Sequence, residues 1–447
     1  MFADAVRRPG RLMASLLIVA ACAACASPAH ASAQVFVDPG FVDTACAGGS
    51  GTVISPPQSW LAGAAFVVTR MLPGGTTLVV ASAGYPSSSF AEAYAFTSDC
   101  EPDRAFGSNG VERLAFGGHA FYIAAAVPAA GGGILLAGGT AKGWLVARLD
   151  ASGSPNPTFG SGGWTVVPWP GSASAIAVTP SGDIVLGGSE GGGCCIQEWV
   201  GELNAGGGIV TEFGSGGRAS VPVYRDDSGI TRVWVEPDGD IFALTSGGNM
   251  GCWGVSVSAL TSSGSKVPSF QSNFNAAMRR VSPSGVFAGD VVVRSTGFLV
   301  AGTEQSTCVG TPGGNAKPQG RVAAFAFNGK LDPGFAADGV AGFSAPMAES
   351  VWALPRNNGG FVLAAAPPVF ETNPHAKAEL LFFDLSANGG VDHAFGNRGV
   401  AALQLPFFSQ SYPASAVPIA LATNGAVSSL VTSTANGKAL RLILLNC

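Results

Sequence analysis

The chain has 447 residues, of which 47% are hydrophobic, only 11% are charged and 64 are glycine. Soluble domains carry about 25% charged residues on average, so this composition argues against a protein built from amphipathic helices, which need a charged face. The net charge of −5 and the lack of a basic segment argue against nucleic-acid binding. Many short strands joined by glycine-rich turns fit the composition better.

The first 33 residues have the parts of an export signal. A basic start with Arg7, Arg8 and Arg11 precedes the apolar segment Leu12–Ala26, which is too short to span a bilayer comfortably. Small residues then form a cleavage site that ends at Ala33. We therefore expect residues 1–33 to be a signal peptide and residues 34–447 to form one exported domain, in the periplasm or outside the cell.

A lipid anchor is the alternative at this end of the chain. Val19–Cys22 resembles a lipoprotein processing site, which would attach lipid to Cys22. Later apolar runs such as Leu440–Leu445 have the length of strands, so no transmembrane segment is expected.

One motif recurs seven times along the chain: a polar turn followed by phenylalanine and often by glycine. Its phenylalanines are Phe41, Phe106, Phe159, Phe213, Phe270, Phe335 and Phe395. A second marker, a glycine turn between two apolar strands, also occurs seven times, for example in Pro180–Asp183 and Pro237–Asp240. Glycine supplies the positive φ that such hairpins need. The two markers agree on seven units.

Each unit is expected to form four short strands. In the second unit these are Phe121–Val127, Gly133–Ala137, Gly143–Leu149 and Gly163–Val167. Several strands are apolar along their whole length, which is typical of strands buried on both faces. We therefore predict an all-β fold, a closed seven-bladed β-propeller of four-stranded blades. An open solenoid is the structural alternative.

The repeat resembles that of the bacterial delta-60 repeat family. The resemblance is carried by Leu331–Phe335, by Phe159–Gly163 and by Ala177–Gly188, and it extends over nearly the whole expected mature chain. The fourth unit departs from the pattern, because Phe270–Asn273 lacks the glycines that should follow the phenylalanine. The resemblance implies a propeller, but it implies little about function because the family is largely uncharacterised.

The two ends of the domain complement each other. The last unit has three expected strands, Val417–Ala422, Ala426–Val431 and Ala439–Leu445, and lacks the motif and the strand that should follow. The mature N-terminus begins with these pieces, Asp38–Phe41 and Gly51–Ile54. We expect the N-terminal strand to complete the last blade, which would remove the free sheet edges.

Seven cysteines follow the signal segment, and an exported protein can form disulfides. They are Cys46, Cys100, Cys194, Cys195, Cys252, Cys308 and Cys447. A Cys46–Cys447 bond would lock the ring, and Cys46–Cys100 is the competing pair.

The other four cysteines fall in loops on one expected face of the ring. Disulfides between neighbouring loops are favoured over a metal site, because no histidine accompanies them and adjacent Cys194 and Cys195 lack zinc-type spacing. We expect no metal and no cofactor.

The sequence contains no constellation typical of an active site. We expect a monomeric binding scaffold, whose long loops engage a protein or saccharide ligand on one propeller face. Candidate ligand-face residues are Arg225, Asp226, Asp227, Glu304, Glu371 and His375. The alternative is an extracytoplasmic hydrolase or lyase that acts on a carbohydrate or lactone, for which several carboxylates or histidines should converge at the mouth of the ring.

Overall fold

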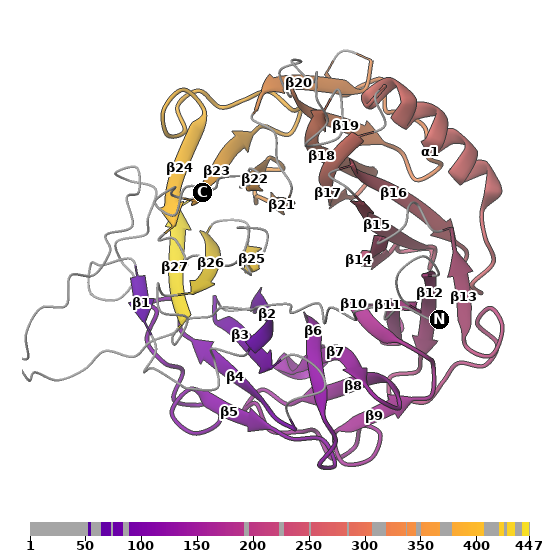
Figure 1. Ribbon diagram of the computed structural model, residues 1–447, viewed down its shortest axis with the longest axis vertical. Coiled ribbons are helices and arrows are strands. Elements are labelled where there is room, and N and C mark those ends of the chain that lie inside the picture. Colours follow the sequence, from indigo (N-terminus) through magenta and orange to yellow (C-terminus); the bar gives the residue numbers. More distant parts are fainter. Residues whose placement is uncertain are drawn as a thin grey trace, which may run out of the picture.

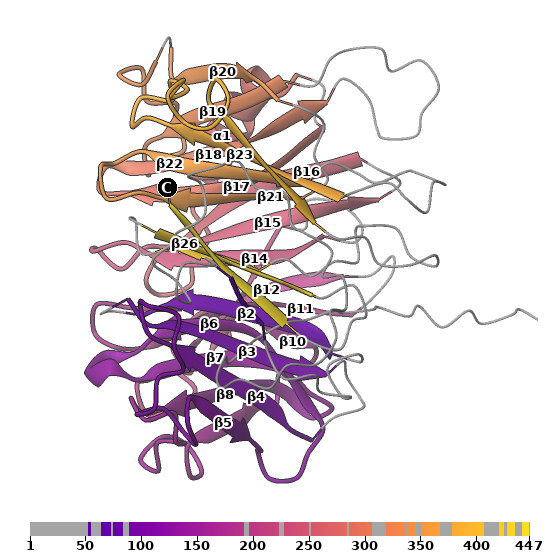
Figure 2. The ribbon, with the colours of Figure 1, turned by 90° about the vertical axis from the view of Figure 1, so that its left-hand side faces the viewer.

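A computed structural model gives the fold of the chain. It describes residues 52–54, 64–72, 75–83, 89–191, 196–222, 228–249, 252–283, 286–305, 319–336, 338–345, 350–366, 378–405, 420–423, 427–433 and 440–446. In this part of the chain the strands form seven antiparallel sheets, which are arranged around a common centre (Figure 1). Seen edge-on, the strands run between the two faces of the ring (Figure 2).

The sheets follow one another in chain order. Blade 1 contains β2 (Ala64–Met71), β3 (Thr77–Ala83), β4 (Ala91–Phe96) and β5 (Val111–Leu114). Blade 2 contains β6 (Phe121–Pro128), β7 (Ile134–Thr140), β8 (Gly143–Leu149) and β9 (Trp164–Val167), with the short 3-10 helix η3 (Ala130–Gly132) in its first turn. Blade 3 contains β10 (Ser172–Val178), β11 (Ile184–Glu190), β12 (Gln197–Leu203) and β13 (Arg218–Val221).

Blade 4 contains β14 (Ser228–Val235), β15 (Ile241–Asn249), β16 (Cys252–Leu260) and the helix α1 (Pro268–Val281). Blade 5 contains β17 (Val286–Arg294), β18 (Gly297–Gln305), β19 (Gln319–Phe325) and β20 (Val340–Ser344). Blade 6 contains β21 (Ser350–Pro355), β22 (Phe361–Ala366), β23 (Ala378–Leu385) and β24 (Val400–Leu405). The terminal sheet contains β25 (Ala420–Thr423), β26 (Val427–Ser433), β27 (Leu440–Asn446) and β1 (Thr52–Ile54).

The predicted architecture, an all-β propeller with four-stranded antiparallel blades, is confirmed. The four strands expected in the second unit correspond to β6–β9, and β8 has the predicted bounds, Gly143–Leu149. In each sheet the first strand in chain order after the connecting segment lies nearest the centre, from β2 to β25 (Figure 1). Residues on these inner strands of different blades can therefore meet around the axis of the ring.

One blade differs from the prediction. Six of the seven described sheets have four strands, but blade 4 has three, so the expectation of seven four-stranded blades is wrong. Helix α1 occupies the outer position of this blade (Figure 1). Pro268 fits the first turn of a helix. Gln271, Ser272 and Asn273 follow Phe270 where other units have glycines, and the helix-favouring residues 276–280 come next. The missing glycines thus mark a change from strand to helix.

At five junctions between described blades, the recurring phenylalanine of one blade packs against a glycine of the next. Phe159, which belongs to blade 2, is 1% exposed, and its ring faces Gly207 in a turn of blade 3. A Cβ atom on Gly207 would lie 2.9 Å from that ring, and this glycine has a φ of +90°. The neighbouring amide of Gly160 donates to the carbonyl of Gly206 across the same junction (2.9 Å). The motif is therefore an inter-blade contact as well as a turn.

The same contact recurs at four other junctions. The phenylalanine–glycine pairs are Phe106–Gly153, Phe213–Gly264, Phe270–Gly329 and Phe335–Gly389. Phe270 keeps this contact although it lies in helix α1, so blade 4 preserves the junction while losing the strand.

Strand β1 belongs to the terminal sheet. It pairs antiparallel with β27, with Thr52 opposite Ile443 and Ile54 opposite Arg441. Segments from the two ends of the described chain therefore share one sheet, as Figure 1 shows by the indigo and yellow strands.

The described core consists of apolar clusters between neighbouring blades. Trp144 and Trp169, for example, meet edge-to-face with ring centroids 5.4 Å apart between blades 2 and 3. Trp169 and Trp234 are buried. No helix in the described residues is long and apolar enough to cross a membrane.

Candidate functional site

Three charged side chains interrupt the apolar inner strands. Arg70 lies near the end of β2, Arg232 lies within β14 and Asp290 lies within β17. Arg232 is flanked by the buried strand residues Ile230 and Val233. Charged residues are seldom placed in such strands unless they are paired or functional. We call these three residues the central charge cluster.

Arg232 and Asp290 form a bidentate ion pair between blades 4 and 5. Arg232 donates from Nε to Oδ1 and from Nη2 to Oδ2 of Asp290, both at 2.5 Å. The Asp290 side chain is 8% exposed, and it also accepts the amide of Ala353 in blade 6 at Oδ2 (3.0 Å). One carboxylate therefore ties three consecutive blades together at their inner strands. The two hydrogen bonds from Arg232 and the one from Ala353 fix the orientation of the Asp290 carboxylate.

Arg70 has no comparable carboxylate partner among the described residues. Its Nε donates to the carbonyl of Ala126 in blade 2 (2.6 Å), and its Nη1 donates to the carbonyl of Thr69 (2.8 Å). The pKa of Arg70 is lowered to about 10, mainly by burial and in part by the positive charge of Arg232, while the negative charge of Asp290 opposes the change. The cluster therefore contains two guanidinium groups and one carboxylate whose charges act on one another.

The chemistry of the cluster is that of anion binding. Guanidinium groups offer five N–H donors each and stay protonated, so they serve poorly as general bases. Within the described ranges no group of three histidine, cysteine or acidic residues is arranged to hold a metal ion. The cluster itself holds one carboxylate, that of Asp290, beside two guanidinium groups.

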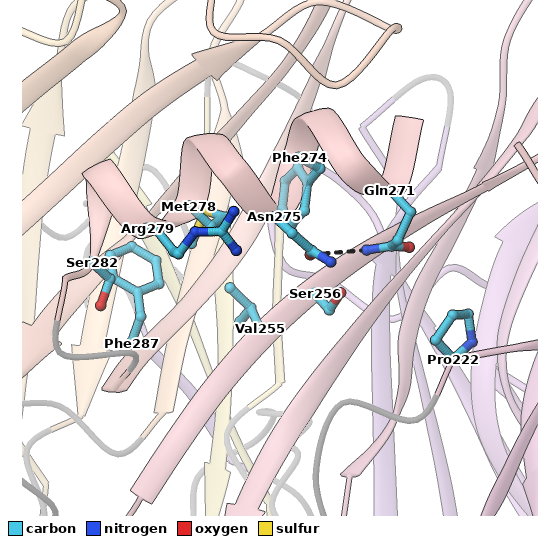
Figure 3. Close-up of a pocket in the computed structure, with 10 residues that line it drawn as sticks. All are labelled: Pro222, Val255, Ser256, Gln271, Phe274, Asn275, Met278, Arg279, Ser282 and Phe287. Carbon is cyan, nitrogen blue, oxygen red and sulfur yellow. Dashed lines mark hydrogen bonds between the residues drawn. The ribbon is translucent and has the colours of Figure 1, made fainter. Parts of the chain in front are cut away.

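A second feature is a groove between helix α1 and strand β16 (Figure 3). Its volume is about 320 Å³, which lies at the small end of the range for ligand pockets. The residues that line it are Pro222, Val255, Ser256, Gln271, Phe274, Asn275, Met278, Arg279, Ser282 and Phe287. We call it the β16 groove.

The groove lies where other blades have their fourth strand. The amide of Val267 donates to the carbonyl of Ala259 (3.1 Å), so Ala259 directs its backbone toward the outer edge of β16. In an antiparallel strand every second residue directs its backbone groups to the same edge. Val257 and Val255 therefore present their N–H and C=O groups outward. No backbone bond from another described strand or loop reaches them.

The helix side of the groove is polar. Gln271, Asn275 and Arg279 follow one another at four-residue spacing and thus lie on one face of α1. Gln271 donates from Nε2 to Oδ1 of Asn275 (3.0 Å) and accepts from Oγ of Ser258 (3.2 Å). Arg279 is exposed and has no carboxylate partner in the described part of the chain. Figure 3 shows these side chains reaching from the helix toward the strand.

A buried acid in a turn of blade 4 is a third unusual feature. Glu236 is 5% exposed, and its Oε1 has no hydrogen-bond partner among the residues that the structure describes. The pKa of Glu236 is raised to about 7, mainly by burial and in part by the negative charge of Asp238, while the nearby indole of Trp234 opposes the rise. Asp238 and Asp240 themselves form the polar turn that follows, where the amide of Asp240 donates to Oδ1 of Asp238 (3.2 Å).

The predicted disulfides are only partly covered by the structure. Cys100 is 2% exposed and disulfide-bonded. Cys252 begins β16, but its side chain is not described. The remaining candidates lie outside the described residues: Cys46, Cys194, Cys195, Cys308 and Cys447. The choice between Cys46–Cys447 and Cys46–Cys100 therefore stays a prediction, as does the absence of a metal site at these loops.

Most of the predicted ligand-face residues also lie outside the described part. These are Arg225, Asp226, Asp227, Glu371 and His375. Glu304 is described, and its Oε2 lies 3.1 Å from Nε of Arg321 on the neighbouring strand β19 of the same blade. It is therefore engaged in a pair within blade 5.

The sequence-based prediction missed both the central charge cluster and the β16 groove. The central charge cluster could have been recognised in the sequence, because Arg70, Arg232 and Asp290 each interrupt an apolar strand. The lack of glycines after Phe270 in the fourth unit was the sequence feature that indicated a change at the β16 groove.

Comparisons with known proteins add little. No family model matches the chain, and no curated protein matches it. Among solved structures, polysaccharide lyase Uly1 aligns with a TM-score of 0.43 and 8% identity over 85% of this chain and 89% of that one.

Two further structures align equally weakly. Drosophila Semaphorin 1b, extracellular domains 1–2, gives a TM-score of 0.38 and 11% identity over 85% and 84% of the two chains. Prolyl oligopeptidase B from Galerina marginata gives 0.43 and 11% over 82% of this chain, which spans only 46% of that protein. At these values the similarities carry no conclusion about function.

Proposed function

We propose that this protein is a binding scaffold that captures an extended polypeptide segment in the β16 groove. The observation that carries the proposal is the outer edge of β16, where Val255 lines a groove in the place that a fourth strand takes in the other blades. An extended peptide can add to such an edge through main-chain hydrogen bonds, as in strand addition to other sheets.

The outer edge of β16 differs from the outer edges of the other blades in two ways: the strand is longer, and helix α1 covers it. The outer strands β5, β9 and β13 have only four residues each, which limits pairing with foreign strands. Strand β16 has nine residues and is shielded by α1, which leaves the groove between them. A partner would therefore enter a defined slot rather than join an open edge, which favours selective binding over aggregation.

The side chains that line the groove also indicate which type of side chain the bound peptide contains. The amide side chains of Gln271 and Asn275 can bond to the backbone of an incoming strand. Arg279 supplies a positive charge on the same face of the helix. We therefore expect an acidic side chain in the bound segment, placed opposite Arg279.

A peptide selection tests this proposal. Peptides selected from a random phage-displayed library on the wild-type protein should lose at least about tenfold in affinity when Asn275→Trp fills the groove. The matched control is Ala276→Trp, an exposed neighbour on α1 that does not line the groove. Binding should also protect the amide of Val255, which lines the groove, from hydrogen exchange.

The outcomes separate clearly. Selected peptides should be enriched in acidic residues, and Arg279→Gln should weaken them. Peptides that bind N275W as well as wild type, or that leave the Val255 amide unprotected, would show that strand addition at β16 is wrong.

We further infer that the terminal sheet is the seventh blade and that β1 closes the ring. The pairing of Thr52 with Ile443 supports this inference, as does the position of β25, which contacts both β21 and β2. Such closure leaves no inner junction open between the first and last blades.

We also propose export, and membership of the delta-60 repeat family. The signal-like first 33 residues support export to the periplasm or the cell exterior, and the bonded state of Cys100 fits an oxidising compartment. A lipid anchor at Cys22 remains the alternative to a free exported protein.

A further inference from the structure

We propose that the disulfide of Cys100 is a redox-sensitive clasp that ties blade 1 to the terminal sheet, with Cys46 as its partner. The clasp takes the place that a phenylalanine–glycine contact has at the five described junctions. Cys46 itself lies outside the described residues. The clasp requires the closure of the ring by β1 inferred above, and it is independent of the β16 groove.

Cys100 occupies the position of the glycines that receive the motif phenylalanines, which we call the seat glycines. In blade 2 the amide of Gly153 donates to the carbonyl of Asp150 (3.0 Å), and in blade 1 the amide of Cys100 donates to that of Thr97 (2.9 Å). A second bond closes each turn, from the amide of Asp150 or Thr97 to the residue after the glycine or cysteine (2.9 and 2.8 Å). The same two bonds form around the other seat glycines, Gly207, Gly264, Gly329 and Gly389.

The backbone of Cys100 also has the conformation of the seat glycines. Its φ is +65°, and the φ values of the five glycines lie between +79° and +90°. A positive φ is uncommon for a residue that has a Cβ atom. Blade 1 therefore places a cysteine where the turn itself favours glycine, which indicates that the thiol has a role there.

The seat holds a covalent bond in blade 1 instead of an aromatic ring. A Cβ atom on Gly153 would lie 2.6 Å from the ring of Phe106, so a seat that receives a phenylalanine has no room for a side chain. Cys100 is 2% exposed and disulfide-bonded. The disulfide thus takes over the contact that the phenylalanine makes at the other seats.

The seat of each blade faces the blade that precedes it in the chain. Gly207 of blade 3 receives Phe159 of blade 2, and Gly389 of blade 6 receives Phe335 of blade 5. In a closed ring the sheet before blade 1 is the terminal sheet, whose strand β25 contacts β2. We therefore expect the partner of Cys100 to come from the terminal sheet.

The sequence identifies one cysteine at the required place in that sheet. The part of a blade that reaches the next seat begins at the motif phenylalanine and ends at the outer strand, as from Phe159 to Trp164 in blade 2. The outer strand of the terminal sheet is β1, so the corresponding stretch of sequence runs from Phe41 to Thr52. Cys46 is the one cysteine in this stretch.

The competing cysteine, Cys447, has a different position in the repeat. It follows Asn446, the last residue of β27, as Thr97 follows Phe96, the last residue of β4. Both of these last residues pair with the first residue of the preceding strand. Cys447 therefore corresponds to the first residue of a seat turn, and the seat of the terminal sheet is the one that would face blade 6.

The clasp forms and opens by thiol–disulfide exchange. Two cysteine thiols reduce a disulfide oxidant to two thiols, and they become joined by an S–S bond themselves. A dithiol reductant reverses the reaction and ends as a cyclic disulfide. Because Cys100 is buried, we expect reduction to be slow in the folded protein and fast once the junction opens.

A peptide map of the exported wild-type protein, purified without reductant and alkylated before digestion, tests the pairing. Trypsin cleaves after Arg70, Arg104 and Arg441, which places Cys46, Cys100 and Cys447 in three different peptides. We expect a linked peptide that contains Cys46 and Cys100 and that separates on reduction.

Variants test the role of the bond. Addition of a dithiol reductant should lower the Tm of wild type by at least about 2 °C, and the decrease should be smaller in Cys46→Ser. The matched control, Cys447→Ser, should still give the linked peptide with Cys46 and Cys100. Cys100→Gly should be more stable than Cys100→Ser, because both lack the clasp but glycine adopts the positive φ of the seat without strain.

The contrary results separate the clasp from the closure of the ring. A linked peptide that joins Cys100 to a cysteine other than Cys46, or alkylation of both cysteines before reduction, would show that the clasp is wrong. Equal stability of C100G and C100S would show that position 100 is not a seat. Hydrogen exchange at Thr52–Ile54 reports separately on β1, and unprotected amides there would overturn the closure itself. If the variants fail to fold, the map of the wild-type protein still decides the pairing.

Discussion

Replacement of Phe159 by alanine is expected to destabilise the protein by about 3–5 kcal/mol, the usual cost of removing a buried phenylalanine from a core. Phe159 is 1% exposed and belongs to the cluster that contains Trp144 and Trp169. Its ring also fills the space beside Gly207, so the cavity would open at the junction between blades 2 and 3. Guanidinium unfolding, followed by tryptophan fluorescence, measures the loss.

The chain offers a matched control for this substitution. Phe395 occupies the same motif position, and its amide donates to Asp392 as that of Phe159 donates to Asn156, both at 3.1 Å. Phe395 is only half-buried. Phe395→Ala should therefore cost clearly less, because the transfer part of the loss scales with the apolar area removed from water. Equal losses would show that burial at the blade junction is not what the motif provides.

Replacement of Glu236 by glutamine is expected to stabilise the protein at pH 8 and to change little at pH 4. The folded-state pKa of about 7 lies above the ordinary value of 4.5. Between these values the folded protein retains a proton that the unfolded chain releases, so stability falls as the pH rises from about 4.5 to 7. At 1.36 kcal/mol per pKa unit, the gain for E236Q above pH 7 is about 1–3 kcal/mol.

Unfolding measured at pH 4, 6 and 8 tests the sign as well as the size of this effect. Asp238→Asn removes one cause of the raised pKa and should give a smaller stabilisation in the same pH window. Exposed Glu101 serves as the control, and E101Q should follow wild type at every pH. A gain for E236Q that is equal at pH 4 and pH 8 would point to packing rather than to the buried charge.

Local sequence patterns predicted the strands well, because each repeat carries its own turns and apolar runs. Gly143–Leu149 has the predicted bounds, and five of the motif phenylalanines, from Phe106 to Phe335, are buried as a recurring anchor would be. The expected fourth strand after Phe270 was wrong. A strand there needs glycine-rich turn geometry, and the residues from Gln271 onward favour a helix instead.

The sites were harder to predict because they depend on which strands lie nearest the axis. Arg70, Arg232 and Asp290 are far apart in the sequence, and only the ring brings them together. Each could be recognised as a charge within an apolar strand, but nothing local indicates its partner. The β16 groove depends in the same way on α1, which exists only in blade 4. The predicted ligand-face loops fall largely outside the described residues, with Glu304 as the exception.

The phenylalanine junctions have a consequence for how the protein is made. Each junction is directional: the aromatic ring comes from one blade and its seat, Gly207 in the case of Phe159, comes from the blade that follows in the chain. During synthesis, an emerging blade therefore exposes its phenylalanine until the next unit has been added. Chains that are exported before folding would avoid this vulnerable interval, and a chain interrupted between blades would end in an exposed aromatic residue that chaperones and proteases can recognise.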